Sequence, residues 1–432
     1  MSEGLILVLV VAASYLAARV AFEWLAKRFL IVSGAEYLLL GILLGPQVSG
    51  ILSPGAVESF APITSLGLGW MGALIGAQLV LPRMIRTAAV LYRVAMAESI
   101  LTFLVTAALM AAGIYGTFDV TPRVAIIAGI GLGAVATVSA TAGVAVVARQ
   151  LGRRSPVVQQ LEVASATNAV VGILVSGLLF AIVHPDPDAA VIGRPLTPTE
   201  WAVITIAVGV VGGALFHLFV GEERKVDRLF ISLAGAVILV SGAATYLRLS
   251  PLLAAACFGF VLANTTRSRA QITIALERVE RPLYFALLVL AGATWRPSVR
   301  DWVVLVLLFL LVRIAAKIGA ARLAARWNGM LPALGPHWGR GLLGQGGLAL
   351  AVALSYLYQE DVPLSNLVFT AAVASVLLTD ILSARFVRSL VYADVKDVVA
   401  GRKEAEPTKA PVPVGPVPPD AAQPDARSSA ED

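Results

Sequence analysis

Long apolar runs recur along the whole of this chain, and they limit what it can fold into more than any other feature. Of its 432 residues, 58% are hydrophobic and 14% are charged, whereas soluble chains carry about 25% charge. A helix needs about 20 mostly apolar residues to cross a bilayer. Transmembrane β-barrels show short alternating segments instead. The sequence therefore predicts an all-α polytopic membrane protein embedded in a lipid bilayer.

About thirteen runs qualify as transmembrane helices, and two short ones among them leave twelve as the alternative count. They lie near 4–25, 31–51, 60–80, 88–114, 122–149, 157–183, 200–220, 227–247, 250–265, 282–295, 300–326, 339–358 and 364–390. Residues 1–30 hold an extra N-terminal helix, which lacks the basic segment and cleavage site of a signal peptide. Residues 31–395 form the main transmembrane domain. Residues 396–432, rich in Pro, Ala and charge, are expected to be a disordered cytoplasmic tail.

The charges between the runs predict an orientation. If the N-terminus lies outside, the inner loops hold most basic residues, and the outer loops are poor in them and carry acid. Cytoplasmic loops are enriched in Lys and Arg, so we expect the N-terminus outside and the C-terminus in the cytoplasm of an inner-membrane protein. The same rule accounts for the net charge of +6, so no nucleic-acid partner is inferred. The chain has one cysteine, no metal-ligand spacing and no nucleophile–base motif, so we expect no disulfide, cofactor, metal or enzymatic activity.

Two runs are interrupted near their middle by small and polar residues. The run at 122–149 contains TVSATAG, and the run at 339–358 contains GLLGQGGLALA. Each is the second of three spans, in groups at 88–183 and 300–390. The groups are an odd number of spans apart, so they enter the membrane from opposite sides, as inverted repeats do. Interrupted helices in matching places point to a transporter's binding site, with close packing of small residues as the alternative.

The glycines of these interruptions are expected to let the helices break. They are Gly143 in the first run and Gly344, Gly346 and Gly347 in the second. Backbone groups freed by a break inside a membrane must line a cavity or meet protein partners. Gln345 can supply such a partner through its side-chain amide.

Six segments resemble the monovalent cation–proton antiporter superfamily, the sodium/proton and potassium/proton exchangers, over roughly residues 30–390. In order they are EYLLLGILLGP, LGAVATVSATAGVAVVARQLGRR, QLEVASATNAVVGILV, RPLYFALLVLAGA, RIAAKIGAARLAAR and GQGG. The resemblance implies inverted repeats with two crossed broken helices, a core domain, a dimerisation domain and a homodimer. The implied function is secondary antiport of Na⁺ or K⁺ against protons.

The sequence departs from this family at its charged positions. The essential aspartate of the fifth core helix is replaced by Ala169, and a glutamate before it by Ala164. At the first break, Ala142 stands where many members have aspartate, and Gln345 stands where one branch has an arginine. The missing acid and the missing base are partners in the family. Their joint loss leaves no orphan charge in the membrane, where such a charge would be costly.

The resemblance places the transport site at Ser139, Thr141, Ser165, Asn168, Lys317 and Gln345. Hydroxyls and amides coordinate ions without titrating, so exchange still needs a group that binds either a proton or a cation. Glu98 could face the core and carry the proton, or it could have a packing or interface role. Glu162 is the other candidate, or else a helix cap at the cytoplasmic mouth. Lys317 either carries a proton itself or neutralises the ends of the broken helices.

Two other functions remain open at this stage. Lys317 and the helix N-termini give the site a positive bias, which suits a same-fold transporter of an anion or a neutral solute. A transport-inactive sensor or partner subunit is the second alternative.

Overall fold

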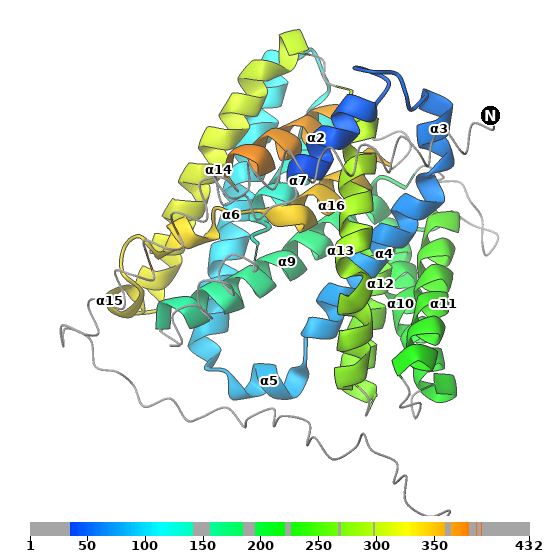
Figure 1. Ribbon diagram of the computed structural model, residues 1–432. Coiled ribbons are helices and arrows are strands. Elements are labelled where there is room, and N and C mark those ends of the chain that lie inside the picture. Colours follow the sequence, from blue (N-terminus) through cyan, green and yellow to red (C-terminus); the bar gives the residue numbers. More distant parts are fainter. Residues whose placement is uncertain are drawn as a thin grey trace, which may run out of the picture.

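The computed structural model describes residues 35–140, 156–184, 195–220, 226–266, 269–296, 299–358 and 364–379, with the single positions 386 and 390. Throughout these ranges the regular structure is helical (Figure 1). Five described helices are long and apolar enough to cross a membrane: Ala89–Thr117, Pro156–Ile182, Pro198–Val220, Arg228–Tyr246 and Val303–Trp327. The predicted all-α membrane fold is confirmed. The expected first span and the C-terminal tail lie outside the described residues.

The described helices follow the expected runs closely. They are α2 (Ala35–Leu44), α3 (Pro54–Ser59), α4 (Ala61–Gln78), α5 (Leu81–Arg86), α6 (Ala89–Thr117), α7 (Pro122–Thr137), α9 (Pro156–Ile182), α10 (Pro198–Val220), α11 (Val226–Tyr246), α12 (Pro251–Thr265), α13 (Arg269–Thr294), α14 (Val299–Trp327), α15 (Leu331–Leu334), η1 (Trp338–Leu342), α16 (Gly346–Leu357) and a last helix at Ser365–Thr379. Several begin with proline, which suits a first helical position. The Thr121 and Ser250 side chains cap α7 and α12 by accepting backbone N–H groups.

The span expected near 282–295 is present as the apolar segment Pro282–Thr294, and it forms the second half of a longer helix, α13, which begins at Arg269. The first half of α13 is amphipathic, because Ile272, Ala275 and Leu276 are buried at helical spacing while Glu277 and Arg278 are exposed. A search for 20 apolar residues does not detect a helix with one charged face.

Two hydrophobic clusters organise the interior. The first joins α6, α7, α9, α14 and α16 to the last helix, and it surrounds the interrupted segments. The second joins α4 to α10, α11, α12 and α13. Helices α4 and α12 approach so closely that a Cβ atom on Gly72 would lie 2.2 Å from the Leu252 carbonyl oxygen. Small residues permit this close backbone contact between membrane helices.

Candidate transport site

The two interrupted segments meet in the interior of the protein. Helix α7 ends at Thr137, and η1 and α16 are separated by a short break at residues 343–345. The backbone N–H of Ala140 donates to the Gly344 carbonyl at 2.8 Å. The Ser139 hydroxyl donates to the Leu342 carbonyl, also at 2.8 Å. Each break therefore supplies hydrogen-bond partners for the other, and α7 and α16 lie together in the centre of the molecule (Figure 1).

The residues of GLLGQGGLALA have separate structural tasks. The Gln345 side-chain amide donates to the Val135 carbonyl in the last turn of α7 at 2.9 Å, so it satisfies a backbone group of the other break. Gly346 has a φ of +60°, which disfavours any residue with a Cβ atom. At Gly347 a Cβ atom would lie 1.6 Å from the ring of Tyr284. Glycine and glutamine are thus required by the break and by its close contacts.

Two buried cations lie at the carbonyl ends of the broken helices. Lys317 Nζ donates to the Thr137 carbonyl at 2.7 Å. The Arg313 guanidinium donates to the Leu343 carbonyl at 2.9 Å and to the Val138 carbonyl at 3.4 Å. A helix C-terminus carries about −0.5 of an elementary charge, so a cation there is favourable. Lys317 therefore lies where its charge can neutralise the carbonyl end of α7, which is one of the two roles considered from the sequence.

Glu98 faces the core of the protein, directly opposite Lys317. Its Oε1 atom lies 3.0 Å from Lys317 Nζ, and both side chains have 0% exposure. The Thr102 hydroxyl donates to the same oxygen at 2.8 Å. The second oxygen, Oε2, has no hydrogen-bond partner among the described residues. Because a buried charge requires an opposite charge or several hydrogen bonds, this ion pair fixes how α6 faces α14.

A second polar chain runs beside the ion pair. The Ser99 hydroxyl donates to Asn168 Oδ1, and the Asn168 amide donates to the Ser139 hydroxyl at 3.2 Å. Because Ser139 also contacts the Leu342 carbonyl, the chain joins α6, α9 and both breaks. Ser165, one turn before Asn168 on α9, is buried as well.

Some predicted residues stay apart from the crossing. Glu162 is half-buried on α9, and in the described part of the chain no hydrogen bond or ion pair links it to the breaks. Thr141 and Gly143 lie outside the described residues. Ser139, Asn168, Lys317 and Gln345 are brought together, with Gly344 between them.

Sequence reasoning named Glu98 but missed the rest of the polar face of α6. Glu98, Thr102 and Thr106 lie at four-residue intervals, and all three are fully buried. This spacing places them on one side of a helix whose other residues are mostly apolar. The four-residue spacing of these polar side chains was therefore a signal in the sequence, and a test of this run for helical periodicity would have found it.

Most of the chain matches a known family of membrane proteins. The family described as "Sodium/hydrogen exchanger, transmembrane" matches residues 35–390. The chain belongs to the sodium/hydrogen exchanger family. No curated protein matches this exchanger significantly. Among solved structures, the sodium proton antiporter MjNhaP1 from Methanocaldococcus jannaschii at pH 8 is 16% identical, with 89% of this chain and 98% of that chain covered and a TM-score of 0.64.

These comparisons confirm the resemblance and the fold. The exchanger is a multi-pass membrane transporter and not an enzyme. Its family supports cation–proton antiport in general. The likeness to the archaeal antiporter, at this low identity, is a likeness of fold.

Proposed function

We propose that this exchanger performs secondary antiport of a monovalent cation, Na⁺ or K⁺, against protons, and that the Glu98 carboxylate binds the proton and the cation in turn. The observation that carries the proposal is the buried Glu98–Lys317 ion pair at the crossing of the two breaks. Glu98 is the one fully buried carboxylate among the described residues. Because alanines stand at the family's acidic positions, another titratable group has to bind the proton for exchange to occur, and Glu98 is proposed as that group.

The geometry allows the two loaded forms to exclude each other. A proton on Glu98 removes its charge, so neither Lys317 nor a cation is then attracted to it. The ionised carboxylate attracts a cation, and hard oxygen ligands are available beside it on Ser99, Asn168 and Ser139. Thr141, Ser165 and Gln345 complete the proposed set of polar ligands. Competition for one carboxylate couples binding of the cation to release of the proton.

A second candidate is transport of an anion by the same fold. The observation in its favour is that two buried cations, Arg313 and Lys317, outnumber Glu98, the one fully buried carboxylate of the described residues. The carbonyl ends of α7 and η1 offset part of this excess, since each cation donates to them. Antiport of a cation is preferred for this reason.

The remaining assignments rest on loop charge and on the family. We propose a homodimer in the cytoplasmic membrane with its N-terminus outside and its C-terminus inside. The proposed organisation is an N-terminal extra helix at 1–30, the transport domain at 31–395 and a cytoplasmic tail at 396–432.

Transport by proteoliposomes with a trapped pH dye tests the proposal. After a proton gradient is imposed, addition of Na⁺, K⁺ or Li⁺ is expected to dissipate it for at least one cation. Glu98→Gln should reduce this response to background, whereas Glu58→Gln, an exposed carboxylate on α3, should retain it. If Glu162→Gln abolishes the response instead, Glu162 on α9 is the proton carrier.

Two results would overturn the assignment. A folded wild-type protein that responds to no cation would contradict antiport. Anion uptake that is abolished by Lys317→Ala would establish the second candidate in its place.

A further inference from the structure

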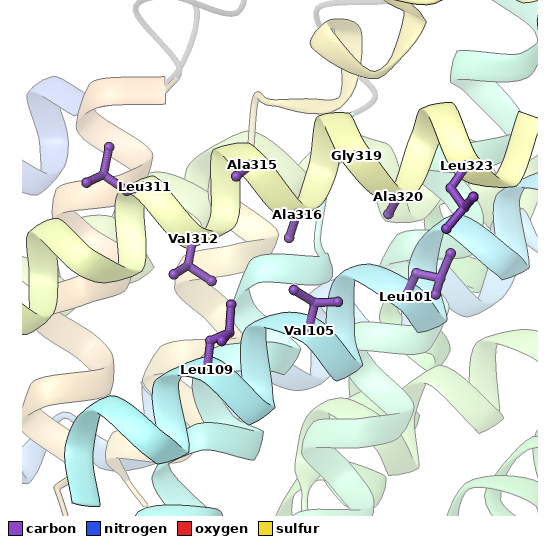
Figure 2. A pocket seen from close by; sticks show the side chains of 10 residues that line it. All are labelled: Leu101, Val105, Leu109, Leu311, Val312, Ala315, Ala316, Gly319, Ala320 and Leu323. Carbon is purple, nitrogen blue, oxygen red and sulfur yellow. The ribbon is translucent and has the colours of Figure 1, made fainter. Parts of the chain in front are cut away.

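An apolar groove of about 580 Å³ runs between α6 and α14. Leu101, Val105 and Leu109 of α6 form one side, and residues 311–323 of α14 form the other (Figure 2). The two helices run antiparallel, because Leu109 lies near Leu311 and Leu101 near the other end of the groove (Figure 2). The groove opens on the membrane-facing side, where Leu109 is 50% and Leu311 is 68% exposed.

The length of the groove fits one leaflet of a bilayer. From residue 311 to residue 323 a helix rises roughly 18 Å at about 1.5 Å per residue. The hydrocarbon core is about 30 Å thick, so one leaflet accounts for about 15 Å. The groove is kept open at Gly319, where an added Cβ atom would meet nothing within 4 Å. A single acyl chain has the shape and the polarity to lie in it.

Basic residues gather at one end of this groove. Arg322 lies in its last turn on α14 and Arg326 lies one turn beyond, and both are exposed. Arg93 lies about two turns beyond Leu101 on α6, at the same end, and is exposed as well. In the described part of the chain, none of the three makes a hydrogen bond or an ion pair. Trp327 beside them is 64% exposed, and exposed tryptophan marks the level of the lipid headgroups.

We propose that this groove binds an anionic phospholipid, with one acyl chain between α6 and α14 and the phosphate on Arg322 and Arg326. Arginine binds phosphate through two parallel N–H donors, and its planar group is desolvated more easily than an ammonium. Arg93 adds a third positive charge beyond the same end of the groove. The lipid contacts α6 and α14, which are the helices that carry Glu98 and Lys317. The site does not depend on which ion is transported.

Lipid titration of the purified exchanger tests the site. Phosphatidylglycerol and phosphatidylcholine with the same acyl chains are added to delipidated protein, and bound lipid is counted by native mass spectrometry. Each basic residue near a membrane surface contributes about 1 kcal/mol, so Arg322→Gln with Arg326→Gln should weaken phosphatidylglycerol binding about thirtyfold. Binding of phosphatidylcholine should be unchanged. Arg83→Gln with Arg86→Gln, on the short helix α5, is the matched control for charge.

The acyl chain is tested separately. Gly319→Leu adds a side chain in the groove, where its Cβ atom would meet nothing within 4 Å, and it should reduce binding of both lipids, whereas Gly116→Leu adds the same side chain outside the groove, where its Cβ atom also meets nothing. Circular dichroism of each variant excludes misfolding as the cause. Equal binding of the two lipids by the wild type would overturn the proposal. So would control variants that lose as much binding as the groove variants.

Discussion

The Glu98–Lys317 ion pair makes a quantitative prediction about stability. The charges are 3.0 Å apart and fully buried, so their attraction is about 5 kcal/mol at an effective dielectric constant of about 20. Removal of one partner from a buried pair costs about 3–5 kcal/mol, because the other charge stays buried without it. We expect Glu98→Gln and Lys317→Met each to lower the free energy of unfolding by about 3 kcal/mol. The double substitution should cost at least about 2 kcal/mol less than the sum, since no orphan charge remains.

A double-mutant cycle measures this coupling. Unfolding in mixed detergent micelles can be followed by the fluorescence of the seven tryptophans. Glu58→Gln combined with Lys317→Met serves as the control pair, because Glu58 is exposed on α3, and its effects should add within about 0.5 kcal/mol. If the Glu98 and Lys317 effects are also additive within that limit, the two side chains are not paired in the membrane, and the reasoning is refuted.

Two further substitutions test the crossing itself. Gly347→Ala should destabilise the protein by about 1–3 kcal/mol in thermal unfolding, because its Cβ atom would overlap the Tyr284 ring, and in a Tyr284→Ala background the same substitution should cost much less. Full stability of Gly347→Ala alone would show that the ring does not lie there. Gln345→Leu should cost about 1–3 kcal/mol, because the buried Val135 carbonyl then loses its side-chain donor, and an unchanged unfolding midpoint would contradict this contact.

The positions of the two interruptions were predictable from the sequence, and their crossing was implied by the family resemblance. Glycine and glutamine inside an apolar run are unfavourable unless the helix breaks, and Lys317 lies too deep in its run to reach the membrane surface. These residues can be recognised in the sequence because each is unfavourable in a continuous apolar helix. Both interruptions can therefore be located from the free-energy cost of placing their residues in an unbroken apolar helix, without knowledge of the tertiary structure.

The partner of Lys317 was harder to predict. Helix α6 is apolar on its lipid-facing side and on most of its buried side, so hydrophobic periodicity does not fix its rotation about its own axis. Whether Glu98 faces lipid, a subunit interface or the core depends on packing against α14 and α9. The sequence left these alternatives open, and the packed structure selects the core.

Pairing of Glu98 with Lys317 also bears on what can drive this transporter. One carboxylate that exchanges one cation for one proton carries the same charge in both loaded forms. A charge that moves through 100 mV of membrane potential gains or loses about 2.3 kcal/mol, but a one-for-one cycle moves no net charge. As long as Lys317 keeps its proton, the two ion gradients alone set the direction of exchange. A cell could then depolarise its membrane without reversing the flow.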